Sequence, residues 1–410
     1  MEKQKQKKTP LIRILISIRR WELLLLAGLI LAGTLGYVLY HRLFANTSME
    51  IVDSLGGNIF PSAILATAAT GETYVLPCDT PFVGTPSSLI GVKVRSRTRN
   101  TRVRVEVAET PFFRRSVSEF ILPRAWTEYV VYPDIVWNFD VLRANVQATP
   151  VSVVVQAQVG LHNVRERVRT FSVRSINECL LGYYRTFSDG KRRFIDRRQL
   201  FAAYVNEDNP LIDKVLREAL DTRIVNRFVG YQGDSATVVR QVYALWNVLQ
   251  RRGFKYSSIS NSSLSSGVAA AQRVRTFEDA MASSQINCLD GSVLMASLMR
   301  AINLVPILVR LPRHMFVGFY TDREQRHANY LETTMVGNVN LDDYFPDEKL
   351  DSTMQHRTRN EASLLTFSKA MEYAQNNMEK NAKYFQHNMV GYTLFPITSD
   401  VRRRIQPIGK

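Results

Sequence analysis

One stretch of the chain carries most of the information about its fold: residues 284–337, which read SQINCLDGSVLMASLMRAINLVPILVRLPRHMFVGFYTDREQRHANYLETTMVG. After Cys288, apolar residues at helical spacing predict a buried helix that ends near Ile302. Asn303 follows at the position after the helix end, where a left-handed residue is common, and Asn tolerates that conformation well. The run VPILVRL at 305–311 is rich in β-branched residues and predicts a strand directly after the helix.

Two further strands follow, and each carries a titratable side chain. His314 begins the run HMFVGFYTD, and Glu332 lies in YLETT, after the polar turn DREQRHAN. If these two strands pair in an antiparallel hairpin, the side chains of His314 and Glu332 come within reach of each other. The order along the chain is therefore a cysteine at a helix start, a histidine on one strand and an acid on the next.

This order predicts a thiol nucleophile with its base. The positive end of a helix macrodipole stabilises a thiolate. A neighbouring imidazole takes the thiol proton and returns it to a leaving group, and a third group fixes the ring in one orientation and tautomer. We assign Cys288 as nucleophile, His314 as base and Glu332 as the orienting acid.

Other residues compete for these roles. A lone cysteine is most often a small buried hydrophobe. His327 is the alternative base, although it lies in the polar turn, and Asp322 and Asn329 are the alternatives to Glu332. Asp290 is expected to bond the start of the helix.

Two side chains before the cysteine are candidates for the oxyanion site. Gln285 and Asn287 each carry an amide that donates hydrogen bonds, and each precedes Cys288 closely enough to act beside its backbone N–H.

The stretch resembles the transglutaminase-like superfamily, whose core is a papain-like Cys-His-Asp fold. The matching features are Cys288 opening a helix, the turn RAINLVP at 300–306, His314 in HMFVGF and Glu332 in LETT. The resemblance covers roughly 235–337, about a quarter of the chain. It implies a catalytic domain that forms a thioester at its cysteine.

The sequence departs from the family pattern at three places. Glu332 stands where the family has Asp, and Phe316 stands where the family has Trp. Ile286 and Asn287 precede the cysteine, where Gly and a small polar residue are usual.

The resulting functional prediction is a thiol-dependent peptidase or amidase that acts on a protein or peptide substrate through a Cys288 thioester. Hydrolysis is favoured over transfer to an amine, because bacterial relatives are often proteolytic and no amine site is evident. The alternative is a catalytically degenerate envelope protein that binds peptide or protein partners. No cofactor is expected, and the three cysteines include no CxxC pair that would suggest structural zinc.

The N-terminal part predicts a membrane anchor. Residues 21–40 read WELLLLAGLILAGTLGYVLY, and twenty helical residues span about 30 Å, the thickness of a bilayer's hydrocarbon core. Seven Lys and Arg residues precede this segment within 1–20, which predicts a cytoplasmic N-terminus. We therefore expect a single-pass protein of the inner (cytoplasmic) membrane with its catalytic domain in the periplasm or outside. A cleaved signal peptide and a buried core helix are the alternatives.

The remaining boundaries define an α+β protein. Short alternating runs, such as Val103, Val105 and Val107 within TRVRVEVAE, suggest an immunoglobulin-like β-sandwich. The runs that suggest strands are ETYVLP, SLIGVKVRS, TRVRVEVAE, SVSEFIL, TEYVVYP and VSVVVQAQV. From about 186 the pattern becomes helical, with helices expected near 210–221, 236–252 and 360–384. The predicted parts are a linker at 41–60, the β-sandwich at 61–178, the transglutaminase-like domain at 186–350 and a C-terminal helical extension with a basic tail at 351–410.

Three further expectations concern single features. Cys78 and Cys179 flank the β-rich region and are candidates for a disulfide in an oxidising compartment. The serine-rich segment 257–266 is expected to be a mobile loop that borders the active site. The formal charge of +16 is consistent with an anionic partner or a solvated basic surface, and no basic-aromatic interleaving or zinc-finger spacing points to nucleic acid.

Overall fold

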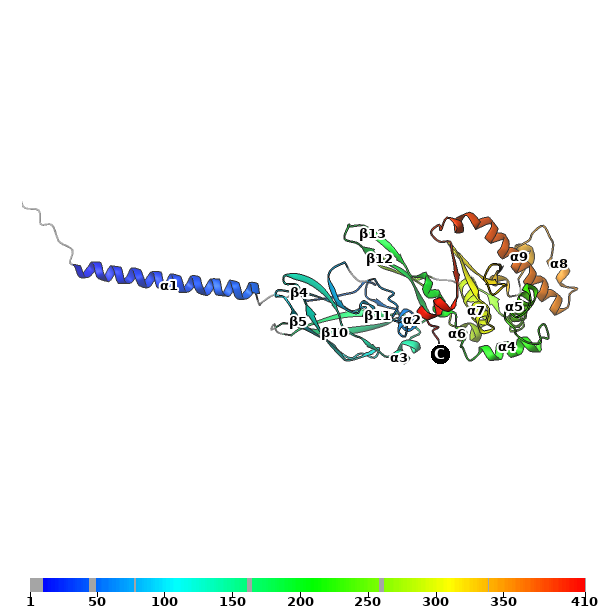
Figure 1. Ribbon diagram of the computed structural model, residues 1–410, viewed down its shortest axis with the longest axis horizontal. Coiled ribbons are helices and arrows are strands. Elements are labelled where there is room, and N and C mark those ends of the chain that lie inside the picture. Colours follow the sequence, from blue (N-terminus) through cyan, green and yellow to red (C-terminus); the bar gives the residue numbers. More distant parts are fainter. Residues whose placement is uncertain are drawn as a thin grey trace, which may run out of the picture.

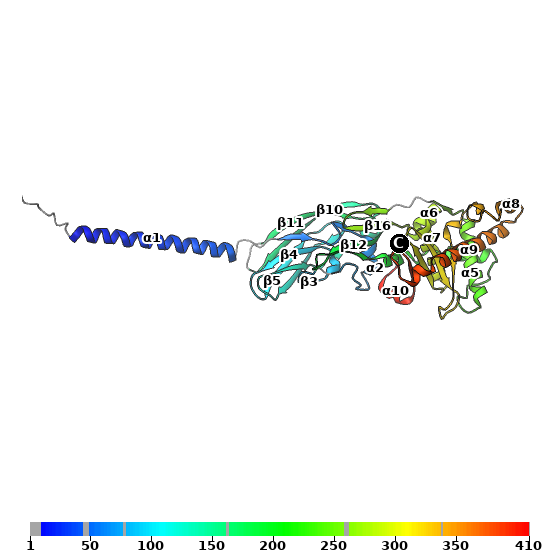
Figure 2. The same ribbon diagram turned by 90° about the horizontal axis from the view of Figure 1, so that it is seen from above.

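The computed structural model describes residues 10–43, 49–76, 79–160, 164–257, 262–337 and 339–409. The protein is a mixed α+β chain with several separate sheets. Figures 1 and 2 show an elongated molecule in which an N-terminal helix projects from the end where the first sheets lie. The helix-rich part of the chain lies at the other end.

The projecting helix α1 (Pro10–Leu43) contains the apolar segment Trp21–Leu39, none of which is buried. The segment is long enough and apolar enough to cross a membrane, as a signal sequence near an N-terminus also is. Its 34 residues correspond to about 50 Å, which exceeds the bilayer core. The helix therefore begins well before the apolar segment does.

The first β-rich region consists of two sheets that share one core. Val103, Val105 and Val107 are buried while Arg102 and Arg104 are exposed, as the alternation predicts. One sheet has the order β1 (Glu50–Val52), β4 (Gly91–Ser96), β8 (Thr127–Tyr132), β3 (Phe82–Gly84). The other has the order β2 (Asn58–Ile59), β11 (Arg165–Val173), β10 (Thr149–Val159), β5 (Thr101–Val107), β7 (Ser116–Leu122).

Three expectations for this region were wrong. Residues 50–52 and 58–59, expected in a linker, form β1 and β2 at sheet edges. The described part of ETYVLP contains no strand, and the chain before it forms helix α2 (Pro61–Thr67). Strand β11 was not expected at all, because its alternation is obscured by three arginines in RERVRTFSV and by residues exposed on one face.

A third sheet joins the two regions and was also unexpected, because residues after 186 were predicted to be helical. Its order is β13 (Arg192–Asp196), β12 (Glu178–Thr186), β16 (Ala269–Arg273), β15 (Ser262–Ser265). The β12–β13 hairpin projects along the molecule toward its N-terminal end (Figure 1). Strand β15 occupies part of the serine-rich segment, so residues 262–265 form a strand rather than a loop.

The second region surrounds a four-stranded antiparallel sheet in the order β20 (Ala328–Leu331), β19 (His314–Tyr320), β18 (Pro306–Leu311), β21 (Thr393–Pro396). Helix α7 (Cys288–Ala301) packs on the face that carries Leu308 and Val317. Helix α9 (Arg359–Gln386) covers the opposite face, where Ala374 joins the cluster of Val309 and Phe316. The sheet therefore lies between two helical layers, and both of its faces are buried.

The helices expected in this region are present. Helices α4 (Ile212–Asp221), α5 (Ser235–Arg251) and α9 correspond to the three predicted ranges. Helix α7 is followed by Asn303 at φ 61°, in the left-handed conformation that the sequence predicts. The remaining helices are α3 (Phe139–Ala144), α6 (Phe277–Ser283), α8 (Asp351–Met354), α10 (Ser399–Arg404) and the 3-10 helices η1 (Pro86–Ser88), η2 (Arg198–Tyr204), η3 (Thr333–Met335) and η4 (Leu341–Asp343). The remaining strands are β6 (Phe113–Arg114), β9 (Val136–Trp137), β14 (Lys255–Tyr256) and β17 (Gln285–Ile286).

The C-terminal segment returns across the molecule after β21. The Gln406 amide donates to the Ala66 carbonyl, and the Ile408 amide donates to the Ala203 carbonyl, both at 2.8 Å. Arg402 pairs with Glu207, which also accepts hydrogen bonds from Arg300 of α7. The tail therefore joins α7, η2 and α2.

Candidate active site

The N-terminus of α7 is held by a capping box. Asn287 caps the helix by accepting from the Asp290 amide at 2.8 Å, and Asp290 accepts from the Asn287 amide at 3.2 Å. Asp290 is 1% exposed and also accepts from Arg275 Nη1 at 2.5 Å. It is therefore a structural residue, as expected. Cys288 follows the cap as the first residue of the helix, where the backbone N–H has no intrahelical acceptor.

A short parallel strand pair fixes the approach to this helix. Strand β17 runs directly into Asn287, and β14 pairs with it so that Tyr256 lies opposite Ile286. Ile286 is 1% exposed, so it anchors the strand in the core. The partly buried Cys288 side chain is consequently presented at a rigid strand-to-helix junction.

His314 and Glu332 are brought together by the β19–β20 hairpin. Val317 lies opposite Leu331, and this register places Glu332, the residue after β20, diagonally across from His314. His314 Nε2 donates to Glu332 Oε2 at 2.6 Å. Glu332 ends the strand and caps η3, rather than lying within a strand as expected.

The carboxylate of Glu332 is buried, and both of its oxygens accept hydrogen bonds. Its side chain is 1% exposed, against 30% for that of His314. Its Oε1 accepts from the amide of Thr334 at 3.1 Å and from the Thr334 hydroxyl at 2.9 Å. Its backbone N–H donates to the Ala370 carbonyl of α9. These contacts hold Oε2 in one direction, toward the imidazole.

The His314 ring lies between the carboxylate and the thiol. Burial lowers the pKa of His314, but hydrogen bonds with Cys288 and Glu332, together with their charges, outweigh burial and raise that pKa to about 10. Because Nε2 is used by Glu332, Nδ1 is the atom left for Cys288. Cys288 on one side of the ring and Glu332 on the other both favour its protonated form. The arrangement is suited to an imidazolium beside a thiolate.

The structure brings together Cys288, His314 and Glu332, and it separates the competing residues from them. His327 lies in the turn with a side chain that is 78% exposed, and its Nδ1 is 3.2 Å from Asp322 Oδ2. Asp322 also accepts from the amides of Arg326 and His327, so it stabilises the turn. Asn329 lies within β20, opposite Phe319.

The two oxyanion candidates differ in their surroundings. Gln285 is exposed on β17. Asn287 is 3% exposed, and its Oδ1 is used in the capping box, which leaves Nδ2 as the atom able to donate to an oxyanion. Their proposed role stays a prediction, and the free amide of Cys288 is the donor that the geometry adds to it.

Two tyrosines near the site were missed by sequence reasoning. Burial, followed by the charges of Cys288 and Glu332, raises the pKa of Tyr256. Burial also raises the pKa of Tyr344, against a hydrogen bond with Thr334 that lowers it. Tyr344, Thr334 and Glu332 therefore form a connected chain behind His314. The spacing of the motif contains no signal for either tyrosine, because both reach the site through tertiary packing.

The remaining sequence expectations concern cysteines and the serine-rich segment. Cys78 lies outside the described residues, and Cys179 is a free, fully buried thiol on β12 whose pKa is raised by burial. Residues 258–261 of the serine-rich segment also lie outside the described residues. The segment does begin beside the site, because the Ser257 amide donates to the Ile286 carbonyl at 2.8 Å. Within the described ranges, no cluster of three or more metal-binding side chains occurs.

Comparison with known proteins adds no assignment. No protein-family model matches the chain, and no curated protein gives a match.

Proposed function

We propose that this protein is a thiol-dependent hydrolase of amide bonds, a peptidase or amidase of transglutaminase-like type that acts through a thioester at Cys288. The observation that carries the proposal is the His314 ring, which interacts with Cys288 and is bonded to the buried Glu332 at 2.6 Å. A histidine in this position serves both as proton donor and as proton acceptor.

The arrangement of elements supports the same class. A buried helix begins at the cysteine and packs against an antiparallel sheet whose consecutive strands supply the histidine and the acid. This is the order of the papain-like core of the transglutaminase-like superfamily. The two N-terminal sheets are consistent with an immunoglobulin-like β-sandwich that serves as a spacer or partner surface.

The chemistry follows from the positions of the three groups. The Cys288 thiolate attacks the amide carbonyl carbon, and the negative oxygen is stabilised by the Cys288 amide. The C–N bond breaks as the His314 imidazolium gives its proton to the departing amine, which leaves a thioester. His314, now neutral, takes a proton from water, whose oxygen attacks the thioester. The C–S bond breaks, and the products are a carboxylic acid and the regenerated thiolate–imidazolium pair.

The proposed location is the inner membrane, with the N-terminus in the cytoplasm and the hydrolase in the periplasm or outside. The exposed apolar segment Trp21–Leu39 and the seven basic residues before it support a single-pass anchor in this orientation. A phosphatase fused after Lys410 is expected to be active only when exported. Activity confined to the cytoplasm would contradict the topology.

The test of the proposal uses the full chain in detergent micelles, a library of blocked peptides and the variant Cys288→Ala. We expect new amino termini with the wild type, a thioester adduct of Cys288 by mass spectrometry, and neither product with the variant. Iodoacetamide should label Cys288 at pH 6–7, whereas the buried Cys179 serves as an internal control that is labelled only after unfolding. A Cys288 that resists labelling at neutral pH contradicts the enzyme proposal and favours a degenerate binding protein.

A further inference from the structure

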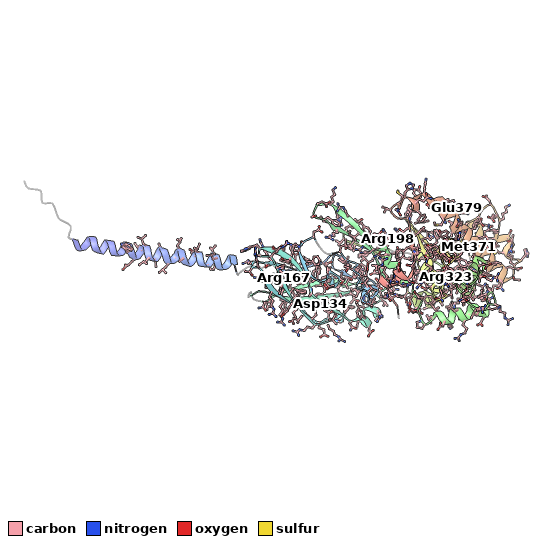
Figure 3. The ribbon with its side chains drawn as sticks, in the orientation of Figure 1. Asp134, Arg167, Arg198, Arg323, Met371 and Glu379 are labelled. Carbon is pink, nitrogen blue, oxygen red and sulfur yellow. The ribbon has the colours of Figure 1, made fainter. Side chains whose placement is uncertain are left out.

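A second feature of the molecule is a cavity lined by Met315, the residue that follows His314 in β19. This cavity of about 230 Å³ opens between the base of the β12–β13 hairpin with η2 and the sheet strands β18, β19 and β21. Its lining includes apolar side chains from both sides, two charged side chains from the hairpin and η2, and one from β18. The lining includes Asp196, Arg198, Phe201, Leu308, Arg310 and Met315. Figure 3 shows Arg198 at the junction of the two regions.

Arg310 contributes a positive charge that has no ion-pair partner among the described residues. It lies on β18 between Met315 of β19 and Thr393 of β21, and its side chain is half-buried. Among the described residues, no carboxylate lies within ion-pair distance of Arg310, and no hydrogen-bond acceptor holds its guanidinium. Burial, followed by the like charge of Arg198, lowers the pKa of Arg310 to about 10, so the group remains charged at neutral pH. A half-buried charge of this kind is costly unless an anion binds to it.

Arg198, on the opposite side of the cavity, adds a hydrogen-bond donor that is not used. Its Nη1 is paired with Asp196 at 2.5 Å, while its Nε is buried without an acceptor among the residues described. Asp196 pairs with Arg198 and also attracts Arg310 from beyond ion-pair distance, so a single carboxylate faces two guanidinium groups. The cavity as a whole carries one net positive charge.

The cavity is close to the catalytic histidine. In the β18–β19 pair, Arg310 lies opposite Met315, and the next pair along the ladder is Leu311 opposite His314. Met315 lines the cavity and is bonded to His314 in the chain. Successive side chains of a strand point to opposite faces, so Arg310 and Met315 lie opposite to the face of His314. They share the face of Leu308, on which α7 packs. The cavity therefore opens on the side of the sheet where Cys288 begins α7, and a substrate held at Cys288 would reach it along that face.

We propose that this cavity is a substrate subsite that binds a carboxylate on an apolar stem, with Arg310 as its anchor. The inference rests on the proposed amide hydrolase function and names its substrate class: amides that carry a carboxylate near the scissile bond. The planar guanidinium fork matches a carboxylate, which can accept two parallel hydrogen bonds. Phe201, Leu308 and Met315 surround the stem. The carboxylate belongs either to an acidic side chain or to a chain terminus.

The first experiment measures binding without turnover. Calorimetry with the full chain in detergent compares hexanoate with hexanamide, which differ only in the charged head group. We expect hexanoate to bind more tightly, and Arg310→Met to weaken it about tenfold. Arg310→Lys should retain part of the preference. Arg313→Met is the matched control, because Arg313 is exposed in the turn beside His314 and does not line the cavity.

The second experiment connects the cavity to Cys288. Two pairs of alkylating agents are compared: iodoacetyl-glutamic acid α-amide with iodoacetyl-glutaminamide, and iodoacetyl-leucine with iodoacetyl-leucinamide. The pair in which the carboxylate accelerates alkylation of Cys288, by about tenfold, identifies the source as a side chain or a chain terminus. The acceleration should vanish in Arg310→Met and persist in Arg313→Met.

The outcomes separate this inference from the proposed function. If hexanoate binds no better than hexanamide, or if Arg313→Met rather than Arg310→Met removes the preference, the carboxylate site is refuted while the hydrolase proposal stands. If hexanoate binds at Arg310 but neither carboxylate accelerates alkylation, the cavity is no subsite of Cys288. If Cys288 itself is unreactive, the hydrolase proposal fails, and with it the subsite, while calorimetry still decides whether Arg310 binds carboxylates.

Discussion

The β19–β20 hairpin carries a histidine–carboxylate pair at each end. The two pairs consist of the same chemical groups, but they differ in the exposure of their side chains, in the distance between the bonded atoms and in the presence of a third partner. At one end, His314 contacts a carboxylate that is 1% exposed, with 2.6 Å between the bonded atoms. At the other end, His327 is 78% exposed and lies 3.2 Å from Asp322, a residue occupied with turn amides. Among the described residues, only the first pair has a third side-chain partner, Cys288. Burial and a thiol neighbour, rather than a histidine–acid contact, therefore define the candidate site.

The largest expected difference is between substitutions of the two histidines, in their effects on the reactivity of Cys288 and on turnover. His314→Ala should lower the rate of amide hydrolysis by about 10²–10⁴-fold, because it removes the proton donor and acceptor. It should also move the iodoacetamide labelling profile of Cys288 to higher pH. His327→Ala, measured in the same assays, should match the wild type. Equal losses in the two variants would remove the distinction between the two ends.

A smaller effect is expected from the two carboxylates. Glu332→Gln should lower kcat by about 10²-fold while KM changes little, because Glu332 orients the ring and does not react. The substitution keeps the shape of the buried side chain, and thermal denaturation should verify that the protein is folded. Asp322→Asn at the exposed end is the control, with kcat expected within about twofold of wild type. A shift in KM alone for Glu332→Gln would argue against the positioning role.

The smallest effect concerns the pH dependence of stability. The folded pKa of His314 is raised to about 10, above the ordinary value of 6.5, so its contribution to the free energy of unfolding is fully present below pH 6.5. That contribution falls as pH rises from 6.5 to about 10, because the unfolded chain releases the proton first. Urea denaturation of the wild type and His314→Ala should therefore converge toward pH 10. His327→Ala should retain the wild-type profile, and a wild-type curve that is flat across this window would contradict the raised pKa.

Local patterns in the sequence predicted the elements around Cys288 and His314 correctly where short-range interactions determine the structure. The helix after Cys288, the strand at 305–311 and the left-handed Asn303 all follow from spacing and turn chemistry within a few residues. The contact of His314 with Glu332 also follows, because a short hairpin connects their strands. Glu332 was misplaced by one residue, since its side chain caps η3 instead of continuing β20.

Features that depend on distant pairing were missed. Tyr256 reaches the site only because β14 pairs with β17, thirty residues later in the chain. Strand β16 consists of AAAQR, whose small residues show no alternation, so its pairing with β12 was not evident. The edge strands β1 and β2 have three and two residues, too few to display a period. In each case the information lies in the partner strand.

The returning C-terminal tail has a consequence for the order in which the molecule folds. Strand β21 completes an edge of the sheet that carries His314, and residues 402–408 contact η2 and α2, which lie about 200 and 340 residues earlier in the chain. Contacts of such sequence separation form late, because the intervening chain must first be brought together. The sheet and the junction of the two regions are therefore completed only after residues 393–408 have been synthesised. In the proposed topology, where the N-terminus stays in the cytoplasm and the chain after Leu39 crosses the membrane, the thiol site would be assembled only after residues 393–408 have crossed.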